Sequence, residues 1–92
     1  MEVVYKEKGN VKTHDLIKMS AEKGMPIVCL TKVEAMIIEK EAEKIGVKIE
    51  KPMSSFELPT RNYRGKVLVD NAEYVLAALI GNPVEAITIT KQ

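Results

Sequence analysis

The sequence predicts a small α/β domain, and three observations carry that prediction. Its 92 residues suffice for one hydrophobic core and not for two. Its apolar residues are mostly aliphatic, because 46% are hydrophobic but only 4% are aromatic, which suits helices packed on a Val/Ile sheet. Short β-prone runs alternate with helical patterns. We expect one domain over residues 1–92, with four short strands in a mainly parallel sheet and three helices, in two or three layers.

The first strand and the first helix are expected near the N-terminus. Residues 3–5 are the β-prone triplet Val-Val-Tyr, and the polar stretch 6–10 ends in turn formers. From Thr13 the spacing becomes helical, and Gly24 can provide a left-handed stop. The expected buried face of this helix consists of Leu16, Ile17, Ser20 and Ala21.

The second strand and the second helix have the clearest signals. Residues 27–30 form a continuous apolar run, as expected of a strand covered on both faces. Thr31 and Glu34 then have the spacing of a capping box, and helical periodicity continues until Gly46. Cys29 lies inside the apolar run, so we expect a small buried core residue.

The second half of the chain begins with an irregular stretch. Residues 47–65 contain prolines, a serine pair and the only two arginines, and loops of this length are usually functional or partly ordered. Residues 67–69 predict the third strand, and residues 84–90 alternate in polarity as a fourth strand would. The helix between them has the expected apolar stripe Val75, Leu76, Leu79 and Ile80.

Charge and cysteine content exclude several classes of protein. Fourteen basic and thirteen acidic residues give a net charge of +1, which disfavours strong nonspecific binding to nucleic acid or to anionic membranes. One cysteine excludes an intrachain disulfide and a cysteine zinc site. The longest uncharged run, residues 74–84, is too short to span a bilayer. We expect a cytoplasmic protein with no membrane partner.

Two sequence features carry candidate chemistry, and the first lies between the first strand and the first helix. Gly9, Lys12 and Thr13 resemble the end of a Walker A loop, in which backbone N–H groups and a lysine hold phosphates and a hydroxyl binds Mg²⁺. Lys6 and Val11 stand where that loop has glycines, and a β-branched residue disfavours close approach to a phosphate. The alternative is an exposed lysine beside an N-cap threonine.

The second feature is the end of the third strand. Residues 67–69 followed by Asp70 resemble a Walker B strand, whose aspartate joins the Mg²⁺ shell. Asn71 stands where the helicase-like ATPases usually have a glutamate that activates water, and an amide cannot act as a general base. The alternative is that Asp70 or Asn71 caps the following helix.

Together the two features resemble the core of a P-loop NTPase of the helicase/RecA-like branch, in minimal and degenerate form. The resemblance implies the strand order one, four, three, two. It places Thr88 or Thr90 at a polar sensor position and implies that Thr13 and Asp70 share Mg²⁺ when Mg-ATP or Mg-GTP binds. Compact proteins of this kind are similar to small open reading frames of phages and mobile elements. The nucleotide-binding residues implied are Gly9, Lys12, Thr13 and Asp70.

A third constellation lies in the irregular stretch. Arg61 and Arg64 flank Tyr63; guanidinium groups can grip phosphates and a tyrosine ring can stack on a base. This loop could therefore contact nucleic acid or an acidic partner, and the alternative is a solvated connection.

These features favour a noncatalytic P-loop-like binding module or accessory protein, with an unknown protein partner or self-association. Efficient NTP hydrolysis is not expected, because glycines of the loop and the glutamate are missing. One alternative is an ATPase or GTPase completed by oligomerisation, with Arg61 or Arg64 supplied in trans. Another is a nucleic-acid accessory protein that uses the Arg61–Arg64 loop, which the near-neutral charge makes the least favoured.

Overall fold

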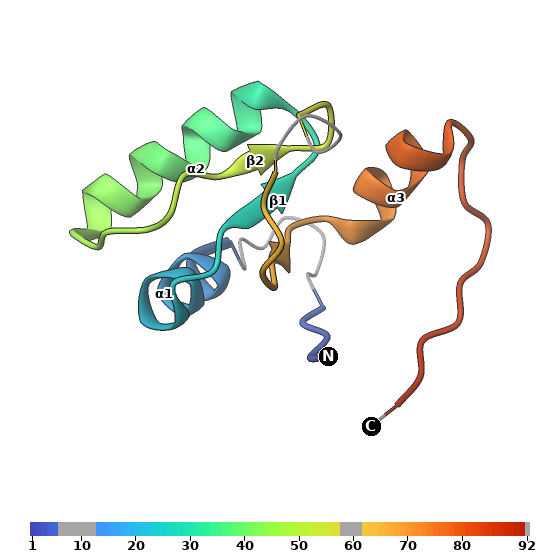
Figure 1. The fold of residues 1–92 in the computed structure, drawn as a ribbon, viewed down its shortest axis with the longest axis horizontal. Coiled ribbons are helices and arrows are strands. Elements are labelled where there is room, and N and C mark those ends of the chain that lie inside the picture. The colour runs from blue at the N-terminus through green and yellow to red at the C-terminus, as the bar shows by residue number, and fades with distance from the viewer. Residues whose placement is uncertain (6–12, 58–61, 92) are drawn as a thin grey trace.

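The computed structural model describes residues 1–5, 13–57 and 62–91 of the chain. Within these residues it is an α/β fold with three helices and one sheet (Figure 1). The elements in chain order are α1 (Thr13–Lys23), β1 (Ile27–Cys29), α2 (Lys32–Ile45), β2 (Met53–Ser54), β3 (Leu68–Val69) and α3 (Ala72–Ile80).

The sheet is parallel and has the strand order β2-β1-β3. Val28 of the central strand pairs with Met53 on one side and with Val69 on the other. All three residues of β1 are buried, as the continuous apolar run predicts. The parallel sheet is confirmed, and so is the adjacency of the strand around 67–69 to the strand around 27–30.

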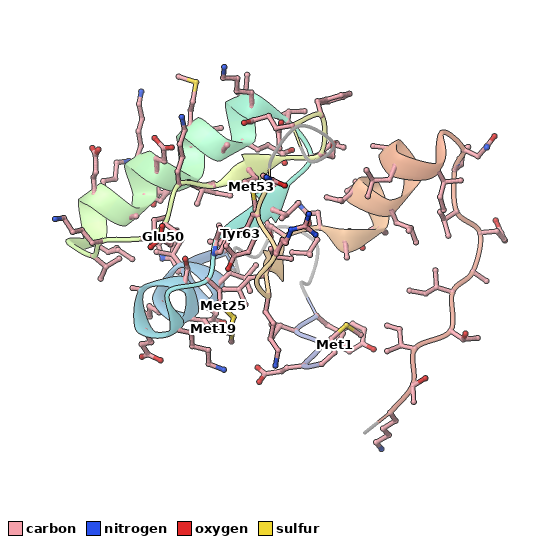
Figure 2. All side chains as sticks on the ribbon, in the orientation of Figure 1. Met1, Met19, Met25, Glu50, Met53 and Tyr63 are labelled. Atoms are coloured by element: carbon pink, nitrogen blue, oxygen red, sulfur yellow. The ribbon has the colours of Figure 1, made fainter. Side chains whose placement is uncertain are left out.

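The sheet separates two layers of helix. Ile27 and Cys29 lie in one buried cluster with Ile17 of α1 and Ile38 of α2. Val28 points to the opposite face, because neighbouring strand residues alternate, and there it joins Met53 and Val75. In the view of Figure 2, Met53 lies between α2 and α3. The fold therefore has three layers, with α1 and α2 on one face and α3 on the other.

Helix α1 follows the predicted pattern. Ile17 and Ser20 are buried against the sheet. The helix stops at Gly24, which has a φ of 67° and donates its N–H to the carbonyl of Ser20 at 2.9 Å. The Ser20 hydroxyl donates to the carbonyl of Met25 at 2.5 Å, so the buried hydroxyl fixes the turn that leads into β1.

Helix α2 is capped at both ends. The N–H of Glu34 donates to Oγ1 of Thr31 at 3.1 Å, and Oε2 of Glu34 accepts the N–H of Leu30 at 3.2 Å. The helix ends at Gly46, whose φ of 76° is left-handed and whose N–H donates to the carbonyls of Ala42 and Glu43. The capping function of Thr31 and the stop at Gly46 are confirmed.

Replacing Thr31 by Ala should destabilise the protein by about 1 kcal/mol, because the N–H of Glu34 loses its acceptor. In a domain of this size that corresponds to a thermal midpoint lower by about 4–8 °C, measured by circular dichroism. Thr31→Ser keeps an acceptor oxygen and should stay near wild type. Equal losses in both variants would show that the threonine methyl group, and not the cap, is responsible.

One strand lies where the sequence predicts a loop. Met53 and Ser54 form β2 inside the stretch 47–65, and Pro52 and Ser55 are buried with them. The prolines and the serine pair of this stretch favour an irregular loop in the sequence. A proline is nevertheless tolerated at the start of an edge strand, and the N–H of Ser55 continues the pairing by donating to the carbonyl of Cys29 at 2.9 Å.

The prediction of four strands in the order one, four, three, two is wrong. Residues 3–5 and 84–90 are described and have no strand assignment, and their apolar side chains Val3, Val4, Ile87 and Ile89 are all more than 40% exposed. The local β pattern of these segments is real, but a strand also needs an adjacent edge to bond with. Figure 1 shows residues 84–91 running back beside α3, away from the sheet.

Helix α3 forms as predicted but buries only one residue of its expected stripe. Val75 is 5% exposed, whereas Leu79 and Ile80 are 53% and 57% exposed. The described sheet ends at β3, so no sheet surface lies beneath the distal half of the helix.

Candidate functional site

Polar side chains gather at the carboxyl edge of the sheet, where parallel α/β folds place their ligands. Cys29 ends β1, Ser54 ends β2 and Asp70 directly follows β3. Their exposures are 0%, 1% and 6%. Buried polar residues are the informative exception in a small core, and here Ser54 and Asp70 bring two of them to the edge where β1 ends in the core thiol of Cys29.

The turn after β2 is organised by serine hydroxyls. The Ser55 hydroxyl donates to the carbonyl of Leu30 at 2.8 Å and so joins the ends of β2 and β1. The hydroxyl and N–H of Ser54 both donate to Oε1 of Glu57, at 3.1 and 3.4 Å. Sequence reasoning missed these residues. The sequence carries no clear signal for them, because a serine pair shortly after a proline is typical of a loop.

Asp70 brings a carboxylate to this edge. Its N–H donates to the carbonyl of Val28 at 2.9 Å, which fixes its position beside the central strand. Burial, together with the negative charges of Glu34, Asp70 and Glu57, raises the pKa of the Cys29 thiol to about 11. Three carboxylates therefore lie near enough to this edge to act on the thiol, and such groups favour a ligand that brings a cation or N–H donors with it.

Asn71 has the only positive φ among the described non-glycine residues, with φ 54° and ψ 57°. It occupies the N-cap position of α3 without a side-chain cap bond. Asparagine tolerates this left-handed conformation better than most residues. The sharp turn from β3 into α3 thus gives a structural reason for an asparagine here. This reason is independent of the glutamate that helicase-like ATPases usually have at this position.

The structure describes some of the residues that the resemblance implies and leaves others outside the described ranges. Asp70 lies at the sheet edge and Thr13 is the half-buried first residue of α1. Gly9 and Lys12 lie outside the described residues. Thr88 and Thr90 are exposed in the extended C-terminal segment, so the sensor position beside Asp70 is not formed in this conformation.

The arginine loop is described only in part. Arg61 lies outside the described residues, and Arg64 is exposed. The Tyr63 hydroxyl donates to the carbonyl of Lys66 at 3.0 Å, and the tyrosine side chain occupies the space that a Cβ at Gly65 would need. Tyr63 therefore orders the approach to β3, although 44% of it stays exposed.

His14 joins the two helices on the same face of the sheet. Its Nε2 lies 3.0 Å from Oε2 of Glu41, and Lys44 contacts the other oxygen of that carboxylate at 3.4 Å. Hydrogen bonds from His14 and then Lys44 lower the pKa of Glu41. With 45% of its side chain exposed, His14 is a surface residue of the first helical turn.

Comparisons with protein-family models, curated proteins and solved structures give no match to this chain. Across the described ranges, no three His, Cys, Asp or Glu side chains are grouped as metal ligands. None of the helices in those ranges has the length and apolar content that a membrane span requires. The chain is thus defined at this level as a small parallel α/β protein with a buried polar edge.

Proposed function

We propose that the protein is a P-loop-like binding module that takes a Mg-nucleotide at the carboxyl edge of its sheet and does not hydrolyse it efficiently. The observation that supports this most is the placement of Asp70. It is 6% exposed, follows β3, and is bonded through its N–H to the central strand. This is where a P-loop-like fold holds the aspartate of its Mg²⁺ shell.

The charge of the edge favours a metal-bound ligand over a free anion. Glu34, Glu57 and Asp70 all act electrostatically on Cys29, so their combined field opposes an uncomplexed triphosphate. Mg²⁺ prefers carboxylate and hydroxyl oxygens together with phosphate oxygens. In this proposal Thr13 and Asp70 hold the metal ion, while Gly9 and Lys12 contact the phosphates.

Weak hydrolysis of the nucleotide follows from the residue next to Asp70, which is an asparagine. A general base within reach of the attacking water is needed for efficient hydrolysis. Asn71 offers an amide, and its left-handed backbone disfavours replacement by a longer side chain. In this proposal the bound nucleotide is not consumed. It instead supports the binding or assembly function of an accessory protein.

Calorimetric titration with Mg-ATP and Mg-GTP tests the proposal, alongside a phosphate-release assay. We expect binding that weakens at least about tenfold in Asp70→Asn and on removal of Mg²⁺ with EDTA, and no phosphate release above the buffer rate. Glu41→Gln is the matched control. It removes a carboxylate from α2 that pairs with His14, and the variant should bind Mg-nucleotide as tightly as the wild type.

Two results would overturn the proposal. One is the absence of any heat of binding at millimolar Mg-nucleotide from a protein whose circular dichroism is folded. The other is rapid turnover that disappears in Lys12→Ala, which would make the protein an enzyme.

A further inference from the structure

The C-terminal arm, residues 72–91, exposes an unusual amount of apolar surface for so small a protein. Among its described residues only Val75 is buried. Figure 1 shows the arm standing apart from α1 and α2. Several large exposed apolar side chains within one segment are typical of interaction sites. The large apolar side chains of the arm and their exposures are Tyr74 60%, Leu79 53%, Ile80 57%, Ile87 57% and Ile89 45%.

The strand next to the arm has an open edge. The N–H groups of Leu68 and Asp70 donate to β1, to the carbonyls of Pro26 and Val28 at 3.0 and 2.9 Å. Because successive residues of a strand direct their main-chain groups to opposite sides, the N–H and carbonyl of Val69 face away from β1. No described strand lies on that side, and Val69 itself is 39% exposed. An edge of this kind is a template for another strand.

The end of the arm has the sequence that such an edge requires. Residues 84–90 place Ile87 and Ile89 on one face of an extended chain and Ala86, Thr88 and Thr90 on the other. This period of two is the strand pattern. The segment is described and belongs to no strand in this conformation.

An open apolar groove of about 250 Å³ lies between β3, α3 and the returning segment. Its walls are apolar apart from Glu73, and both Val69 and Ile87 contribute to them. A strand laid along the open edge of β3 would fill this space and cover both side chains. The apolar residues that line it are Val69, Ala72, Val75, Leu76, Leu79 and Ile87.

The connection between helix and segment favours a strand from another molecule. The chain turns at Gly81, with a φ of 85°, and Pro83 fixes the backbone two residues later. This short, restricted turn sends the segment back beside α3 (Figure 1). Short hinges of this kind promote exchange between identical chains. A net charge of +1 per chain opposes such association only weakly.

We propose that the protein forms a dimer by reciprocal strand exchange, in which residues 84–90 of each copy add to the open edge of β3 of the other. The arm is then the donor and β3 the acceptor, and the contact is the same in both directions, as a two-fold dimer requires. This proposal does not depend on nucleotide binding.

Sedimentation across a range of protein concentrations tests the dimer. We expect a monomer–dimer equilibrium in the full chain. The double variant Ile87→Lys, Ile89→Lys should raise the dissociation constant by more than about tenfold. These residues are more than 40% exposed, so the substitutions leave the core intact. The matched control Val33→Lys, Ile37→Lys changes residues of α2 that are 66% and 54% exposed and should dimerise normally.

Mixing two full-length variants tests the exchange itself. Val69→Pro removes the N–H that faces the open edge and the valine side chain beside it, and keeps the bonds towards β1, which come from Leu68 and Asp70. It blocks the acceptor, while the double lysine variant lacks the donor. Each alone should be monomeric, and the mixture should form a one-to-one heterodimer through the single intact pair of donor and acceptor.

Three results would overturn the proposal. They are a wild-type chain that stays monomeric at all concentrations, a dimer that survives the double lysine substitution, and NMR contacts between residues 84–90 and β3 of the same molecule. If Val69→Pro fails to fold, the dissociation constants of the variants Ile87→Lys, Ile89→Lys and Val33→Lys, Ile37→Lys still show whether residues 84–90 form the dimer contact.

Discussion

Replacing Ile38 by Ala should lower the free energy of unfolding by about 3 kcal/mol, whereas the same change at its neighbour Ile37 should alter it by less than about 0.5 kcal/mol. Ile38 is 2% exposed and belongs to the cluster that joins α1, β1 and α2, while Ile37 is 54% exposed on the same helix. Truncating Ile38 removes apolar contacts and leaves a cavity. Truncating Ile37 removes side-chain atoms that already contact solvent.

Urea unfolding followed by circular dichroism measures both variants. The two substitutions have the same effect on helix propensity, so their difference isolates burial. A loss of about 3 kcal/mol is a large share of the roughly 5–15 kcal/mol that stabilises a typical domain. Similar midpoints for the two variants would contradict the packing of α2 on the face of Ile27 and Cys29.

The elements predicted best are those whose signal is local. The run 27–30 is apolar because both faces of β1 are covered, and the Thr31–Glu34 pair bonds as its spacing predicts. Gly24 and Gly46 end their helices in the left-handed conformation that few other residues adopt without cost. Each of these features depends on residues a few positions apart.

The elements predicted worst depend on pairing. β2 is a strand because β1 has a second edge for it, although Pro52 and two serines suggest a loop. Residues 84–90 have a better strand pattern than Met53 and Ser54 but lie beside α3, away from an edge. Whether a β-prone segment becomes a strand depends on whether it lies next to a free edge of a sheet. The sequence of the segment alone does not specify this.

The candidate site was predicted in the same uneven way. The end of the third strand indicated Asp70, and the parallel sheet brings it to an edge with Cys29 and Ser54. The role of Ser55 was missed, since a hydrogen bond to Leu30 requires knowledge of β2. The sequence indicated Asn71 as a replaced glutamate or as a helix cap, and neither expectation included the left-handed backbone that gives an independent reason for an asparagine.

The Cys29 thiol should react with iodoacetamide at pH 8 more than about 100-fold more slowly in the folded protein than in guanidinium chloride. The thiolate is the reactive species, and a pKa raised from 9.0 to about 11 lowers its population by roughly 100-fold. The side chain is also 0% exposed, which blocks the reagent. Mass spectrometry of the single-cysteine chain measures the rate without ambiguity about the site.

The pH dependence of stability provides the second readout. Because folding raises the pKa of the Cys29 thiol, the folded protein keeps the thiol proton between about pH 9 and pH 11, where the unfolded chain has lost it. Stability is therefore unaffected by Cys29 below about pH 9 and falls as pH rises from 9 towards about 11. Cys29→Ala should remove that part of the decline while losing some stability to packing.

A variant with an exposed thiol is the control for any direct effect of guanidinium chloride on the labelling reaction. Cys29→Ala combined with Val33→Cys places one cysteine at a position that is 66% exposed in wild type, and it should react at nearly the same rate folded and unfolded. Rapid labelling of Cys29 in the folded chain would mean that the carboxyl edge opens to solvent. The same edge would then admit water to Asp70, and the buried, negatively charged site proposed for Mg-nucleotide would lose its physical basis.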